Sequence, residues 1–267
     1  MQQRHFALTG LIASLGRLVL NFIAEMGAMA LFAAQGIRHM PSRGQAGKVI
    51  RQIYFMGAGS FFLIVLIGLF TGMVLGLQGY YNLAQFGSEG LLGSAVALSL
   101  IRELGPVLTA IMVTGRAGSA MAAEIGVMRI SDQIDALEVM DISPMGYLVA
   151  PRVTASLLCF PLLTSVFTIV GILGGYVSGV LLLGISQGVY FDRIASSVVW
   201  ADVQGCLLKS LVFALTVILV CCYKGYFAHM RTDGMGPEAV SNATTSAVVL
   251  SCVLLLTGDY ALTSFLL

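Results

Sequence analysis

Two ionisable residues, Arg102 and Glu103, lie next to each other deep within a long apolar segment. Charged side chains at such a depth in a membrane are costly, and they usually have a binding role or a tightly held ionic partner. A planar guanidinium suits a phosphate group, so in one interpretation Arg102 binds a lipid headgroup in a cavity. In the other it forms a structural pair with a neighbouring helix. Because adjacent residues point about 100° apart around a helix, we expect that the two do not face one partner along the same direction.

Two further ionisable residues, Lys209 and Asp259, fall at similar depths in two later apolar segments. We expect them to form a structural ion pair, with a contact to a substrate as the alternative. Pro106 follows Arg102 by about one helical turn and removes a backbone hydrogen bond, which should kink that helix. A kink beside a charge suits the wall of a cavity.

Catalytic motifs are missing from the sequence. The histidines all lie outside the apolar segments, at His5, His39 and His229, so no serine within those segments has a histidine base. Asp259 has no second aspartate within a span to share a proton with it. The sequence contains neither H-E-x-x-H nor a G-x-x-x-x-G-K-[ST] phosphate loop. We therefore expect no catalysis and no cofactor or metal bound by this chain; if ATP and Mg²⁺ drive it, another chain binds them.

The composition indicates which elements must position these residues. Hydrophobic residues make up 58% of the 267 residues, charged residues only 10%, and the mean hydropathy is +0.93. Soluble domains contain about 25% charged residues, so water is not the main solvent of this chain. A net charge of +1 gives no reason to expect nucleic acid as a partner. Since a helix needs about 20 apolar residues to cross a bilayer, five runs qualify: Ile53 to Leu77, Leu91 to Gly115, Val153 to Leu183, Gly205 to Tyr223 and Ala239 to Leu266.

The basic residues between these runs predict the orientation of the chain. Eleven Lys and Arg residues precede the first run or follow the second and fourth runs, whereas the other connections contain only Arg193. Basic residues mark the cytoplasmic side, so we expect a cytoplasmic N-terminus and a periplasmic C-terminus. The predicted fold is all-α and integral to the membrane. An amphipathic interfacial helix lies within residues 1–50, and five transmembrane helices form a domain over residues 51–267.

Glycine recurs at every fourth position in the first and third runs, at Gly68, Gly72 and Gly76 and at Gly171, Gly175 and Gly179. Small residues at this spacing let two helices approach closely, either within one chain or between two copies. Five helices are also few to enclose a substrate. We therefore predict a homodimer with a close helix contact near the outer half of the bundle.

The connection between the second and third runs predicts a short amphipathic helix. Four apolar residues form its stripe: Ile130, Ile134, Leu137 and Met140. Ser131 is the candidate N-cap, Pro144 lies beyond the end, and acidic residues including Asp135 and Glu138 cover much of the rest. Because anionic cytoplasmic lipids favour basic helices, we expect a protein partner here. A solvated connection packed on its own bundle is the alternative.

The outer end of the first run combines apolar residues with a few polar ones: Leu75, Gln78, Tyr81, Asn82, Leu83 and Phe86. Acyl chains need hydrocarbon contacts and a phosphate needs donors, so this composition suits a phospholipid. We expect a cavity open to the periplasm that also includes Glu103, with Arg102 near the headgroup and with Leu75, Leu83 and Phe86 against the tails. In the alternative, Arg102 only pairs with an acidic side chain such as Glu103 of the partner subunit.

The stretch from Val96 to Val153 resembles the signature region of the MlaE (YrbE) family of permeases, and Gly72 to Tyr80 is similar to it too. The resemblance implies a homodimeric ABC transporter permease in the inner membrane of a Gram-negative bacterium. It implies phospholipid as the substrate and a role in outer-membrane lipid asymmetry. It also implies a cytoplasmic ATPase, a small STAS-domain subunit and a periplasmic MCE-domain protein as partners. In such systems the segment corresponding to Ile130 to Met140 is the coupling helix that docks into the ATPase.

Two other classes of function stay open on the residues alone. One is a secondary transporter driven by an ion gradient through the intramembrane charges, and the other is a scaffold that anchors partners at the membrane. Copurification separates them, because only the ABC permease requires an ATPase subunit on its cytoplasmic face.

Overall fold

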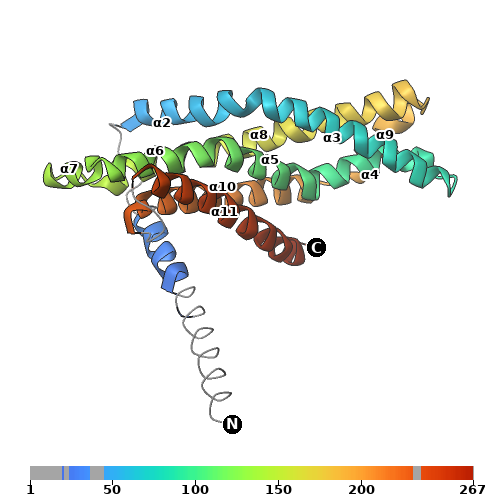
Figure 1. Cartoon of the computed structure of the whole chain (residues 1–267). Helices are drawn as coiled ribbons and strands as arrows, with labels where there is room; N and C mark the ends of the chain where they lie inside the picture. The colour runs from blue at the N-terminus through green and yellow to red at the C-terminus, as the bar shows by residue number, and fades with distance from the viewer. Residues whose placement is uncertain (1–19, 21–23, 37–44, 231–235, 267) are drawn as a thin grey trace, which may run out of the picture.

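The computed structural model describes residues 20, 24–36, 45–230 and 236–266, and helices are the only regular secondary structure within these ranges (Figure 1). Five helical segments are long and apolar enough to cross a membrane: Ala46–Ala84, Glu89–Ile130, Met145–Leu182, Trp200–Tyr226 and Pro237–Leu266. Each contains nearly all of one predicted run. The predicted all-α fold with five spans is therefore confirmed, and each helix continues past its apolar run into polar residues.

The first three spans alternate α-helix with π-helical turns. The first span comprises α2 (Ala46–Ile53), the π turn η2 (Tyr54–Ala58) and α3 (Gly59–Ala84). The second starts with a 3-10 turn and contains two π turns: η3 (Glu89–Leu91), α4 (Leu92–Ser99), η4 (Leu100–Leu104), α5 (Gly105–Val113), η5 (Thr114–Gly118) and α6 (Ser119–Ile130). The third comprises η6 (Met145–Val149), α8 (Ala150–Tyr176) and η7 (Val177–Leu182). Such π turns are frequent at functional sites.

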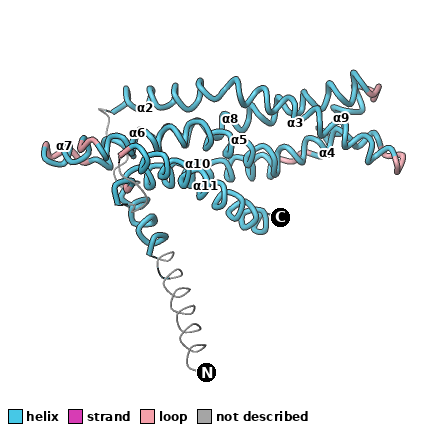
Figure 2. The backbone as a smooth tube through the Cα atoms, in the orientation of Figure 1, coloured by secondary structure: helices cyan, strands magenta, loops and turns pink. Residues whose placement is uncertain are grey.

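The fourth and fifth spans are unbroken α-helices, α10 (Trp200–Tyr226) and α11 (Pro237–Leu266). Short helices occupy the connections: α7 (Gln133–Val139), α9 (Gln187–Ser197) and the 3-10 turn η8 (Ala228–Met230). The loops between the described elements are short (Figure 2). The spans are therefore held close to their neighbours in sequence, which leaves few arrangements open to the bundle.

The first and third spans pack closely along their glycines. A methyl group placed on Gly72 would lie 1.8 Å from the backbone oxygen of Gly171, and one on Gly76 would lie 3.1 Å from that of Gly175. Gly68 faces the backbone of the same helix, α8, at 3.0 Å. The two stripes thus face each other within one chain. They give no support to the prediction that a glycine stripe forms a homodimer contact.

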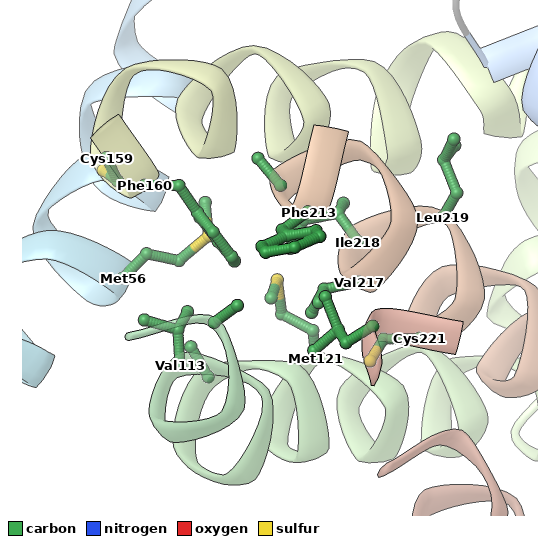
Figure 3. Packing of buried hydrophobic residues seen from close by; sticks show 14 of the residues in the cluster. Met56, Val113, Met121, Cys159, Phe160, Phe213, Val217, Ile218, Leu219 and Cys221 are labelled. Atoms are coloured by element: carbon green, nitrogen blue, oxygen red, sulfur yellow. The ribbon is translucent and has the colours of Figure 1, made fainter. Parts of the chain in front are cut away.

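A core of buried side chains joins the first four spans (Figure 3). Met56 of η2, Met121 of α6, Phe160 of α8 and Phe213 of α10 are all almost fully buried within it. Lipid tails are as apolar as these side chains, so close packing rather than escape from water holds such helices together. This core fixes α10 against the second span, which matters for the charged residues described below.

The helix over residues 24–36 crosses the direction of the spans instead of running along them (Figure 1). Its buried Phe32 packs edge-on against Tyr223 with 5.7 Å between ring centroids, and Glu25 forms an ion pair with Lys224. The helix is thereby attached to the C-terminal end of α10. It belongs to the predicted interfacial segment over residues 1–50; apart from Leu20, the rest of that segment before residue 45 lies outside the described residues.

Candidate functional site

The π turn η4 carries Arg102 and Glu103. Pro106 has no N–H, so the backbone carbonyl of Arg102, four residues earlier, loses its usual amide donor. Lys209 of α10 donates to this carbonyl, with 2.9 Å between Nζ and the oxygen. A π turn thus directly precedes the position where the sequence predicts a kink, and a side chain from a neighbouring span stabilises this turn.

Lys209 is buried and its ammonium group is surrounded by oxygen atoms. Its Nζ lies 2.8 Å from Oε2 of Glu103, 3.1 Å from Oδ1 of Asp259 and 2.7 Å from Oγ1 of Thr263. Only 3% of the side chain is exposed. A buried charge is tolerated when it is paired and hydrogen-bonded in this way. The structure thus brings Lys209 and Asp259 together, as the sequence predicts, and adds Glu103 as a second acidic partner.

Arg102 has an acidic partner that was not predicted from the sequence. Its Nε lies 2.7 Å from Oδ1 of Asp202, in the first turn of α10. The other oxygen of Asp202 accepts the N–H of Val199 at 3.1 Å, so Asp202 also caps the start of α10. Asp202 lies seven residues before Lys209, and hence two turns away on the same face of the helix. The seven-residue spacing between Asp202 and Lys209 is the sequence signal that could have identified Asp202. The same spacing explains how Arg102 and Glu103 contact one helix although their side chains point in different directions.

A cavity of about 660 Å³ lies beside these charges, between η4, the first turns of α10 and the last turns of α11. Arg102, Glu103 and Lys209 line it together with apolar side chains such as Leu208 and Leu266. The Arg102 side chain is 41% exposed and that of Glu103 is 40% exposed, so both present charged groups to the cavity. A few convergent polar groups in an otherwise apolar wall suit an amphiphilic ligand.

The segment from Leu75 to Phe86, at the C-terminal end of α3, does not contribute to this cavity within one chain. Four of its six predicted cavity residues are exposed on the surface: Gln78, Tyr81, Asn82 and Phe86. Leu75 and Leu83 are partly buried and pack against the core. The reason is that α3 packs on α8 and α4, whereas the cavity lies among η4, α10 and α11. Within a single chain, α3 and Arg102 therefore do not line the same cavity.

The connection between the second and third spans contains the predicted short helix, α7, but with different limits. Ile130 ends the preceding helix α6, because Asp132 adopts a left-handed backbone conformation with φ 55° and breaks the helix there. Ser131 is not the N-cap; its hydroxyl donates to the carbonyl of Val127. Of the predicted apolar stripe, Ile134 is fully buried in the chain's own core.

The exposed surface at the end of α7 includes Met140 of the predicted stripe and Val139, which lies outside it. Leu137 is half-buried, while Met140 and Val139 are 64% and 88% exposed. Two of the acidic residues are engaged within the chain: Asp135 pairs with Arg129 at 2.5 Å, and Glu138 accepts the hydroxyl of Tyr226 at 3.2 Å. These two contacts fix α7 against α6 and the C-terminal end of α10.

The comparison with known proteins agrees with this architecture. The family model described as "Permease MlaE" matches residues 49–265. The intermembrane phospholipid transport system permease protein MlaE of Haemophilus influenzae is 37% identical over 96% of this chain and 97% of its own length. A probable ABC transporter permease protein of Rickettsia felis is 37% identical over 94% and 95% of the two chains. The chloroplastic protein TRIGALACTOSYLDIACYLGLYCEROL 1 of Arabidopsis thaliana is 35% identical over 82% of this chain and 61% of its own. The chain belongs to the MlaE family of permeases.

Proposed function

We propose that this chain is the permease subunit of an ABC transporter that moves phospholipids between the inner and outer membranes and so maintains outer-membrane lipid asymmetry. The observation that carries the proposal is the half-exposed guanidinium of Arg102 beside a cavity among the spans. The name of the Haemophilus influenzae relative, which states intermembrane phospholipid transport, supports the same substrate class. Membership of the permease family favours this function over the ion-coupled carrier and the scaffold.

The guanidinium retains the groups that a phosphate needs. Arg102 donates to Asp202 through Nε, and none of the hydrogen bonds or ion pairs within the described ranges uses its two terminal nitrogens. Those nitrogens form the fork that binds phosphate oxygens in pairs. The apolar wall of the same cavity suits acyl chains, so one ligand can satisfy both parts of the site.

The partners follow from the same family membership and from α7. A cytoplasmic ATPase, which would hold ATP and Mg²⁺, docks on the outward surface of α7 around Val139 and Met140. A second copy of the chain, a periplasmic MCE-domain protein and a STAS-domain subunit complete the transporter. The chain lies in the inner membrane of a Gram-negative bacterium with its N-terminus in the cytoplasm and its C-terminus in the periplasm, as the distribution of basic residues favours.

The test replaces Arg102 in the assembled transporter. Arg102→Lys keeps a charge that can pair with Asp202 but loses the fork, whereas Arg102→Gln loses both. We expect phospholipid copurified per protein and ATP-dependent transfer to acceptor vesicles to fall about tenfold or more in Arg102→Gln, and by less in Arg102→Lys. Arg193→Gln, on the exposed side of α9, is the matched control and should leave both quantities unchanged. Unaltered lipid content and transfer in Arg102→Gln would overturn the proposal.

A further inference from the structure

The wall of the cavity presents one positive and one negative group side by side. Arg102 and Glu103 are adjacent in the chain, and about two fifths of each side chain is exposed. The residues that pair with them lie deeper: the side chains of Asp202 and Lys209 are 8% and 3% exposed. A ligand entering the cavity therefore meets a guanidinium and a carboxylate before it meets their partners.

Glu103 retains capacity to accept a further hydrogen bond. Its Oε2 accepts Lys209 at 2.8 Å, and both oxygens share the hydroxyl of Thr263 at 3.1 and 3.2 Å. A carboxylate oxygen has two acceptor positions, so Oε1 has one position that none of the bonds found among the described residues occupies. The two terminal nitrogens of Arg102 likewise take part in no hydrogen bond found in the described part of the chain. The site can thus bind one acceptor group and one donor group of the same ligand.

The charge of the cluster favours a ligand that carries a cation. Counted as ionised, it contains two positive groups, Arg102 and Lys209, against three negative ones, Glu103, Asp202 and Asp259. A ligand with only a phosphate would add a further negative charge next to Glu103, and like charges placed together are strongly unfavourable. A ligand whose phosphate is followed by an ammonium group avoids that repulsion.

We infer that Arg102 and Glu103 together select zwitterionic phospholipids with a primary ammonium headgroup, such as phosphatidylethanolamine, over anionic ones. The phosphate binds the terminal nitrogens of Arg102, and the ammonium donates to Oε1 of Glu103. In an ethanolamine headgroup the phosphate and the ammonium belong to one ligand and are separated by two carbon atoms. A choline headgroup has the positive charge but no N–H. It is therefore attracted to the Glu103 carboxylate but cannot donate a hydrogen bond to it. The inference rests on the proposed binding of phospholipid in this cavity.

The experiment measures competition among three lipids. The assembled transporter, depleted of lipid in detergent, is equilibrated with equal amounts of phosphatidylethanolamine, phosphatidylcholine and phosphatidylglycerol, and bound lipid is identified by native mass spectrometry. We expect the ethanolamine lipid to exceed the glycerol lipid by about tenfold, the effect of one hydrogen bond to a charged group, with the choline lipid between them. Glu103→Gln should reduce this ratio to near one, since Lys209 keeps Asp259 as a partner. Glu89→Gln, which removes a carboxylate outside the cavity, should keep the ratio.

The outcomes separate this inference from the function on which it rests. Equal binding of the three lipids by the wild type, with binding still lost in Arg102→Gln, would overturn the headgroup selection alone. An ethanolamine preference that survives in Glu103→Gln would overturn the role of Glu103. Lipid binding that does not depend on Arg102 would overturn the proposed site itself, and this inference with it.

Discussion

Lys209 donates a hydrogen bond to the backbone carbonyl of Arg102, at 2.9 Å, across the contact between the fourth and second spans. That carbonyl needs an outside donor because Pro106 cannot supply the usual amide. The same ammonium group also contacts Glu103 and Asp259. One lysine therefore stabilises the π turn that displays Arg102 and Glu103, and at the same time connects three of the spans around the cavity.

We predict that Lys209→Met destabilises the chain severely. The substitution leaves Glu103 and Asp259 without their cation and the Arg102 carbonyl without a donor, and breaking a buried pair costs about 3–5 kcal/mol. Thermal unfolding of the purified chain, followed by loss of monodisperse protein, measures the effect. Lys48→Met is the control, because the contact of Lys48 found among the described residues is stacking on the ring of Tyr147, and its loss should cost about 1 kcal/mol or less. Equal melting temperatures for the two variants would contradict the prediction.

Gly72→Ala should destabilise the contact between the first and third spans. The new methyl group would lie 1.8 Å from the backbone oxygen of Gly171, so the two helices must separate, at a cost of about 1–3 kcal/mol. The melting temperature of the purified chain should fall accordingly. Gly258→Ala provides the matched control in α11, since nothing lies within 4 Å of the added methyl group. If Gly72→Ala melted no lower than Gly258→Ala, the close contact of the two stripes would be wrong.

The five spans can be predicted from the sequence because each needs about 20 apolar residues, which hydropathy shows directly. The pairing of Lys209 with Asp259 can be predicted because the two residues lie at similar depths in their transmembrane runs. A buried cation needs an acidic group at the same depth in the membrane. Asp202 does not follow from hydropathy, because it lies in the polar first turn of α10. Its position depends on the extended residues Val198 and Val199, which place α10 after α9.

Other features depend on contacts that no local pattern encodes. The spacing of Gly72 and Gly171 shows which face of each helix is smooth but not which helix covers it. The sequence also does not show whether another helix covers the side of α3 that carries Gln78 and Tyr81. This exposed side could therefore not be distinguished from a cavity wall. Likewise, the start of α7 depends on the left-handed backbone of Asp132, a conformation that aspartate adopts more readily than most residues but only at a small minority of positions.

The contact of α9 with the third span should weaken at alkaline pH. Tyr190 is fully buried, its hydroxyl donates to the carbonyl of Ile172 at 3.0 Å, and burial raises the pKa of Tyr190 to about 12. An exposed tyrosine ionises near pH 10, so the stabilisation is complete below about pH 10 and is lost as the pH rises toward 12. Below about pH 10 the wild type should exceed Tyr190→Phe in unfolding free energy by about 1 kcal/mol. The difference between their melting temperatures should shrink above that pH, and a difference that stayed constant to pH 12 would exclude this role for Tyr190.

The proposed docking of an ATPase subunit can be tested at the exposed end of α7. Val139→Arg places a charge on the outward surface, where 88% of the valine side chain is exposed, so the chain's own packing is unaffected. Leu137→Arg is the weaker test, because Leu137 packs on the core and its loss would also disturb the fold. A charge in an apolar contact costs about 2 kcal/mol or more, so the ATPase should bind at least about thirtyfold more weakly to Val139→Arg. Copurification and ATP turnover measure this, with Val189→Arg on α9 as the control at the other end of the bundle. Full retention of the ATPase by Val139→Arg, alongside a normally folded chain, would show that the motor subunit does not dock on this surface of α7.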